Sequence, residues 1–114
     1  MSPAELLAGL ARELEAIAVL AARGRAAWDA DELLRLAVER RWITAGNYAE
    51  RYRIAAGLDL ATYPWTELYD YRCLLAHAVP EQLDAERIWH DTIADTGRLR
   101  EAVKRQGAEE HDVP

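Results

Sequence analysis

Arg72 and His77 lie five residues apart near the end of a predicted helix, and together their side chains could act on a phosphodiester. Arginine offers a permanent positive charge and a planar fork of donors that matches phosphate oxygens. Histidine can take up or release a proton near neutral pH, because its unperturbed pKa is about 6.5. Since this spacing arises easily by chance in an arginine-rich chain, the pair predicts a phosphate-handling site only in suitable surroundings.

The same two residues also have a structural interpretation. Positive side chains near the C-terminus of a helix interact favourably with its dipole and can bond its last carbonyl groups, which is worth about 0.3–1 kcal/mol. The neighbouring Tyr69, Asp70 and Cys73 could border a substrate or simply cover the surface of the helix. The residues alone leave both interpretations open for this segment.

Hydrophobic residues that recur every three or four positions predict two helices in the first half of the chain. The first covers residues 3–22 and ends before Gly24, and the second runs from a cap at Asp29 or Asp31 to about residue 56. Gly46 lies inside the second helix, where glycine costs about 1 kcal/mol relative to alanine. We favour close packing against another helix over a tolerated defect at this position.

Two more helices are predicted in the second half of the chain. A short one begins near Pro64 and ends close to His77, because Pro80 disfavours helical backbone angles at the residue before it. A final helix follows a cap at Asp84, and the polar residues 107–114 are predicted to form a disordered tail. The residues expected to face the core are Leu7, Leu10, Leu14, Ile17, Ala21, Leu34, Val38, Trp42, Ala45, Trp65, Leu68, Tyr71, Leu75, Ile88, Trp89, Thr92, Leu99 and Val103.

The composition indicates the fold class. Alanine, leucine, arginine and glutamate dominate, while glycine, proline and β-branched residues are few, which favours helices over strands. A chain of 114 residues suits one domain, near the size at which an oligomer interface helps stability. We therefore expect an all-α protein: a single-domain antiparallel bundle of four to five helices over residues 1–106, which self-associates.

Charge and cysteine content exclude several classes of protein. A formal net charge of −6 argues against a surface that holds long nucleic acids through many phosphate contacts, so any RNA contact must be local. The single Cys73 can form neither an internal disulfide nor a cysteine-based zinc site, and we expect no metal and no cofactor. Apolar runs are too short to span a membrane and no basic leader is evident, which predicts a cytoplasmic protein without membrane partners.

Several linked features resemble the HepT-like family of HEPN-domain proteins, the toxin components of bacterial pairs with nucleotidyltransferase antitoxins. They occur in the family's order over roughly residues 34–103. The features are the segment Ala37, Val38, Glu39, Arg40, Arg41 and Trp42 followed by Gly46, the pair Pro64 and Trp65, the motif Arg72-x4-His77, and Asp84 before the pair Ile88 and Trp89.

This resemblance implies a function as well as a HEPN-like fold. In such proteins two copies pair so that both Arg-x4-His helices line one cleft, where RNA is cut without a metal ion to leave a 2′,3′-cyclic phosphate. It implies that His77 handles the proton, that Arg72 stabilises the charged phosphorane, and that a nucleotidyltransferase antitoxin neutralises the homodimer. Tyr69, Asp70 and Cys73 would border the substrate.

Three positions depart from the family pattern. Val79 replaces a tyrosine that in some members accepts adenylyl groups from the antitoxin, so this modification has no hydroxyl to use here. Cys73 replaces a polar residue after the arginine, and Asn47 replaces a glutamate after the glycine. Val79, Cys73 and the acidic net charge favour an alternative: a weakly active or inactive binding module that docks a nucleotidyltransferase or a nucleotide. A third hypothesis is a helical dimer with only an assembly role.

Overall fold

The computed structural model describes residues 1–112, except for the side chains of Pro80, His111 and Asp112. Within this range the chain is helical and contains no β-strand, as the composition predicts. The helices are α1 (Pro3–Ala21), α2 (Arg25–Ala30), α3 (Glu32–Ala56), α4 (Trp65–His77) and α5 (Ala85–Asp112), with a 3-10 turn (Pro80–Gln82) before α5.

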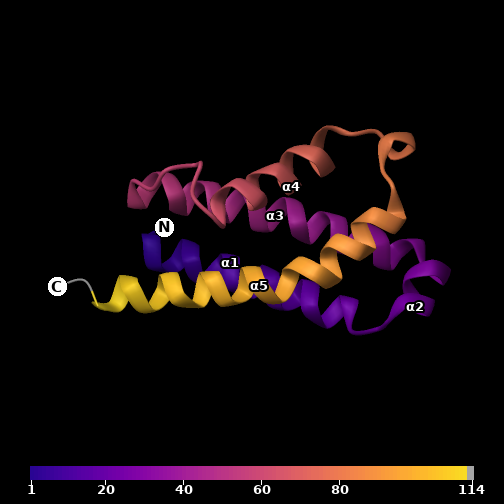
Figure 1. Cartoon of the computed structure of the whole chain (residues 1–114), viewed down its shortest axis with the longest axis horizontal. Helices are drawn as coiled ribbons and strands as arrows, with labels where there is room; N and C mark the ends of the chain where they lie inside the picture. Colours follow the sequence, from indigo (N-terminus) through magenta and orange to yellow (C-terminus); the bar gives the residue numbers. More distant parts are fainter. Residues whose placement is uncertain (113–114) are drawn as a thin grey trace.

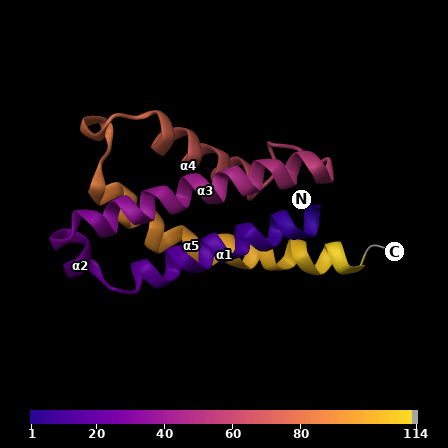
Figure 2. The ribbon, with the colours of Figure 1, turned by 180° about the vertical axis from the view of Figure 1, so that it is seen from behind.

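The helices form one elongated bundle with Cα extents of 49 × 26 × 22 Å. Helix α3 packs against α1 and α4, and α1 also packs against α5. Figures 1 and 2 show the pair of α3 and α4 beside the pair of α1 and α5, with α2 at the end far from the N-terminus. Among the described residues, no helix is both long and apolar enough to cross a membrane.

Side-chain caps and a glycine set the ends of the first two long helices. Ser2 and Glu5 cap α1 reciprocally, since the Ser2 hydroxyl accepts from the Glu5 amide at 3.1 Å and the Glu5 carboxylate accepts from the Ser2 amide at 3.2 Å. Asp31 caps α3 by accepting from the Leu33 amide at 3.0 Å. Gly57 ends α3 at φ +69°, in the left-handed region that glycine adopts without strain.

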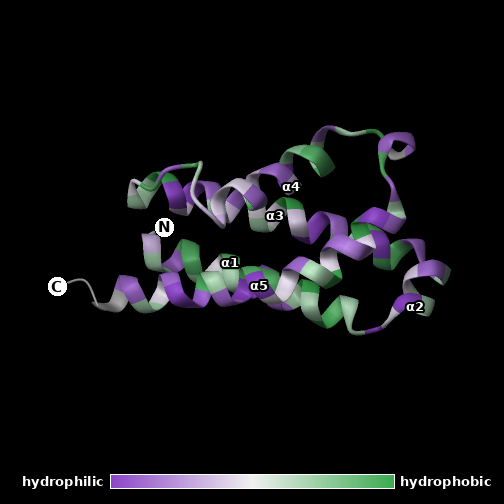
Figure 3. Cartoon of the chain, in the orientation of Figure 1, coloured by the Kyte–Doolittle hydropathy of each residue, from purple (hydrophilic) through white to green (hydrophobic). Residues whose placement is uncertain are grey.

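The predicted helical stripes form the core. Figure 3 shows hydrophobic residues along α1 and mostly hydrophilic ones along the C-terminal half of α5. The buried Trp42 donates its indole N–H to the Thr92 hydroxyl at 3.1 Å, which ties α3 to α5 and satisfies both polar groups. Three residues predicted to face the core are only half-buried. They are Ala21 at the end of α1, Tyr71, which stacks on Trp42 with ring centroids 4.5 Å apart, and Trp89, which packs on Trp28 at 5.4 Å.

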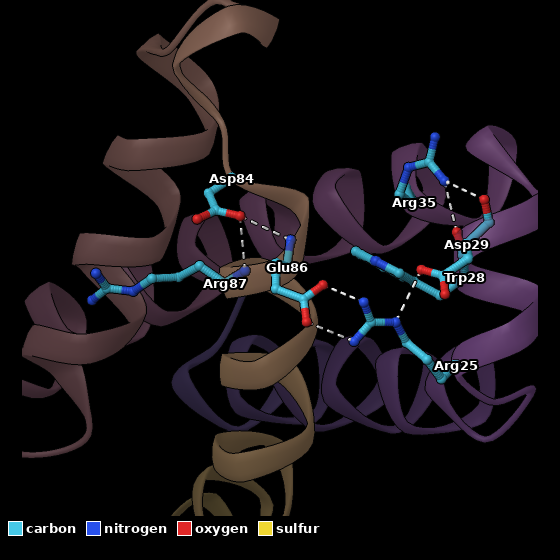
Figure 4. A network of polar contacts seen from close by, with 7 residues as sticks. All are labelled: Arg25, Trp28, Asp29, Arg35, Asp84, Glu86 and Arg87. Atoms are coloured by element: carbon cyan, nitrogen blue, oxygen red, sulfur yellow. Dashed lines mark hydrogen bonds and ion pairs between the residues drawn. The ribbon is translucent and has the colours of Figure 1, made fainter.

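Helix α2 is the element that the periodicity did not predict. Its six residues contain one buried side chain, Trp28, so no repeat can be read from them. Figure 4 shows how it is fixed: Arg25 bridges to Glu86 at the start of α5 and to Asp29 on its own helix, and Arg35 donates to the Trp28 carbonyl at 2.7 Å. The Asp84 cap of α5, predicted from the sequence, accepts from the Glu86 amide at 3.0 Å.

Helix α5 continues through residues 107–112, which the sequence analysis assigned to a disordered tail. Its last turns hold the hydroxyl of the buried Tyr52, which donates to the Glu110 carboxylate at 2.6 Å and accepts from the Gln106 amide at 3.0 Å. Burial, together with this carboxylate, raises the pKa of Tyr52 to about 12. Val113 and Pro114, the rest of the assigned tail, lie outside the described residues.

Candidate functional site

A close crossing of α3 and α4 fixes the position of Arg72. A Cβ atom added at Gly46 of α3 would lie 2.4 Å from the Cβ and 3.2 Å from the Cδ of Arg72, and 3.0 Å from the carbonyl oxygen of Leu68. Any larger residue at position 46 would therefore displace α4. The arginine stem lies directly over the glycine, which confirms the close packing predicted for Gly46.

The guanidinium group of Arg72 bonds to Asn47, the residue that follows this glycine. Its Nε donates to the Asn47 side-chain oxygen across 2.6 Å. Among the side chains that the structure describes, this is the only hydrogen bond of Arg72, so both Nη nitrogens keep their donors for another partner. Arg72 is half-buried and Asn47 is exposed, which leaves the pair accessible from solvent.

Arg72 borders a surface hollow of about 540 Å³ formed by α1, α3 and α4. Tyr48 reaches it across the crossing of α1 and α3, where its ring lies against Gly9; a Cβ there would come within 2.4 Å of the ring. The residues that line the hollow are Met1, Leu6, Thr44, Asn47, Tyr48, Glu50, Arg51 and Arg72.

The charges around this hollow are locally positive in an acidic molecule. Its one lining carboxylate, Glu50, is engaged by Arg53 through two hydrogen bonds of 3.1 and 2.5 Å. The Arg53 guanidinium lowers the pKa of Glu50, and the charge of Arg72 contributes to this shift. Arg51 is exposed and forms no ion pair among the described residues. The arrangement suits an anion.

His77 is separated from this hollow in the single chain. It lies in the last turn of α4, exposed, and it is not among the residues that line the hollow. Five positions along an ideal helix correspond to a rotation of about 140°, so the two side chains leave α4 in different directions. Within one copy of the chain, the hollow that Arg72 borders is therefore lined without His77.

The other predicted site residues also lie on α4, in different environments. Tyr69 and Cys73 are half-buried neighbours on α4: the proximity of Cys73 is the main reason that the pKa of Tyr69 is raised, while the charge of Arg72 lowers it. Both therefore neighbour Arg72. Asp70 is exposed and does not line the hollow.

The contacts of Asn47 and Arg51 could not be predicted from the sequence alone. Asn47 was marked only as a departure from the family pattern, because its bond to Arg72 depends on how two helices cross. Arg51 follows Asn47 by four positions and so lies on the same face of α3, a spacing that could have indicated it. To recognise that Asn47, Arg51 and Arg72 belong to one site, the position of α4 against α3 would have to be known.

A larger groove of about 760 Å³ lies between α1 and α5 and contains none of the predicted site residues. Its lining is mainly apolar, with Ala4, Ala8, Ala11 and Gly97 beside a few charged side chains. It lacks a converging set of reactive groups, so the Arg72 hollow is the stronger candidate site. Among the described residues, no group of three His, Cys, Asp or Glu side chains is placed to hold a metal ion.

No protein-family model matches the chain, and neither curated proteins nor solved structures show a significant match to it.

Proposed function

We propose that this chain is a HepT-like endoribonuclease toxin of the HEPN class, which acts in the cytoplasm as a homodimer and is neutralised by a nucleotidyltransferase antitoxin. One observation carries the proposal. The Arg72 guanidinium is held by a neutral amide at the edge of an open, locally positive hollow, and an exposed histidine follows on the same helix. A phosphate-binding cation and a titratable proton carrier are two groups that can catalyse RNA cleavage through the 2′-hydroxyl.

In the proposed reaction the RNA supplies its own nucleophile. The 2′-oxygen attacks the adjacent phosphorus as its proton passes to a neutral His77. The bond from phosphorus to the 5′-oxygen then breaks, and a protonated imidazole returns a proton to that leaving oxygen. The products are a 2′,3′-cyclic phosphate and a 5′-hydroxyl, and Arg72 balances the extra charge on the phosphorane between them. Such proton transfer typically contributes about 10²- to 10⁴-fold in rate.

The separation of Arg72 from His77 is the reason to propose a dimer. Because one copy directs the two side chains apart, a complete site needs the histidine of a second copy beside the Arg72 hollow. A two-fold dimer supplies this arrangement twice, and it is the commonest symmetry of homo-oligomers. The family resemblance implies the same pairing, with both α4 helices along one cleft.

A second candidate is a binding module without catalysis, which uses the hollow to dock a nucleotidyltransferase partner or a nucleotide. Two observations favour it: His77 lies outside the hollow, and the exposed Val79 has no hydroxyl that an antitoxin could modify. Cys73 in place of a stronger hydrogen-bonding residue points in the same direction.

Incubation of the purified protein with single-stranded RNA in the presence of a chelator separates the two candidates. The endoribonuclease should yield fragments that end in a 2′,3′-cyclic phosphate, and His77→Ala should abolish them. His90→Ala is the matched control, because His90 is also an exposed helical histidine but lies on α5. Intact RNA with the wild-type protein, together with co-purification of a nucleotidyltransferase that Arg72→Ala releases, would establish the binding module instead.

A further inference from the structure

We infer that Asn47 is a positioning residue that aims Arg72 at a phosphate, and that the hollow beside them binds the backbone of a single-stranded nucleic acid with Arg51 as its second cation. This inference rests on the proposed function, because it identifies the groups that bind the phosphate of the proposed substrate. It assigns roles to two residues on α3, outside the Arg-x4-His motif.

The geometry of Arg72 leaves most of its hydrogen-bond donors free for a ligand. Gly46 allows the stem to lie flat on α3, and the Asn47 oxygen accepts from Nε at 2.6 Å. A guanidinium group has five N–H donors, and the bond to Asn47 uses one of them. The two Nη nitrogens therefore keep four donors in a fixed plane, and this fork matches two oxygens of a phosphate.

Asn47, the residue that holds Arg72, carries no charge. An arginine that is held by a carboxylate has its charge largely balanced before any ligand arrives. Asn47 supplies the same hydrogen bond from a neutral amide, so the Arg72 pair keeps a full positive charge for an anion. The asparagine thus orients the arginine without competing with the phosphate.

The other residues that line the hollow also favour an anion. Arg51 is one helical turn from Asn47 on α3, exposed, and without an ion pair among the described residues. The carboxylate of Glu50 is bonded to Arg53, so its charge is balanced mainly by Arg53 rather than by the lining arginines. The phenol of Tyr48 also lines the hollow and has no hydrogen-bond partner among the described side chains.

The distribution of charge favours a single-stranded nucleic acid as the ligand. Two cations in one hollow can contact only a few phosphates, and the net charge of −6 repels a long duplex elsewhere on the surface. A flexible single strand can bring one or two phosphates to this place without approaching the acidic remainder. The local positive charge therefore fits a single strand better than a double helix.

The test is the binding of a labelled oligodeoxythymidylate, which has phosphates but no 2′-hydroxyl and so cannot be cut by the proposed reaction. Asn47→Asp and Arg51→Gln should each weaken its binding about tenfold or more. Arg100→Gln is the matched control, since it removes the same charge from an exposed α5 arginine that lines the separate groove. It should leave the affinity within about twofold of wild type.

Asn47→Asp tests the neutral charge of the Asn47 amide separately from the contribution of this residue to the fold. Aspartate can still accept the bond from Arg72, so the folded state should be as stable as wild type or more stable, with an unchanged or raised unfolding midpoint. Weakened binding by a protein of undiminished stability supports the inference. It is overturned if Asn47→Asp binds as tightly as wild type, if Arg100→Gln weakens binding equally, or if the wild-type protein does not bind the oligonucleotide.

Parallel cleavage assays separate this inference from the proposed function. If RNA stays intact while oligodeoxythymidylate binding depends on Asn47, the catalytic proposal fails and the phosphate site stands. If RNA is cut, and Asn47→Asp both cuts and binds like wild type, the endoribonuclease stands and the role of Asn47 is refuted.

Discussion

Gly46 and Arg72 are packed so closely that a Cβ on the glycine would lie 2.4 Å from the Cβ of the arginine. Neither atom lies at the end of a flexible side chain, so the contact cannot be relieved by a change of rotamer. The same crossing places Asn47 beside the guanidinium group. One glycine therefore connects the packing of the bundle to the geometry of the candidate site.

Gly46→Ala should lower the stability of the protein although alanine is the better helix former. The propensity gain of about 1 kcal/mol is outweighed by overpacking against Arg72 and the Leu68 carbonyl, for a net loss of about 1–2 kcal/mol in urea unfolding. Gly97→Ala is the control, because a Cβ there would meet nothing within 4 Å, and it should raise the stability by about 1 kcal/mol. Equal gains for both variants would contradict the close crossing.

The sequence predicted this crossing because glycine is unfavourable inside a long helix unless a second helix packs closely against it. It could not predict α2, whose six residues are too short to show a period, or the partners of Tyr52, which depend on where α5 passes α3. The polar composition of residues 107–112 suggested a tail, yet Glu110 and Gln106 hold a buried hydroxyl. The position of α2, the partners of Tyr52 and the helical structure of residues 107–112 all depend on contacts between segments that are distant in the sequence.

Glu110→Ala should destabilise the fold by about 1–3 kcal/mol, because the Tyr52 hydroxyl loses its acceptor inside the bundle. Glu109→Ala changes the same type of residue at an exposed neighbouring position, so its stability should stay within about 0.5 kcal/mol of wild type. Denaturant unfolding of the three proteins measures the difference. Two variants of equal stability would show that the last turns of α5 contribute nothing through this bond.

The raised pKa of Tyr52, about 12 against an ordinary value of 10.0, predicts a loss of stability at alkaline pH. The folded chain holds the phenolic proton more tightly than the unfolded chain does. The contribution to the free energy of unfolding is therefore fully present below about pH 10 and is lost as the pH rises toward about 12.

Tyr52→Phe has no such proton, so its stability should fall less than that of wild type between about pH 9 and about pH 11.5. The pKa of Tyr71 is also raised, by burial and by its bond to Asp95. Because Tyr71 is present in both proteins, its contribution to the pH dependence of stability is the same in each and does not affect the difference between them. Circular dichroism during urea unfolding at the two pH values provides the measurement. Parallel losses would mean that Tyr52 does not carry this pH dependence.

Complementation between two inactive variants tests the central proposal, that Arg72 and His77 of different copies form one site. Arg72→Ala and His77→Ala should each fail to cut single-stranded RNA. After the two are mixed, unfolded and refolded together, half of the dimers should pair one variant with the other and contain one intact composite site. The account predicts recovery of about a quarter of wild-type activity. A mixture as inactive as either variant, beside an active wild type, would contradict it.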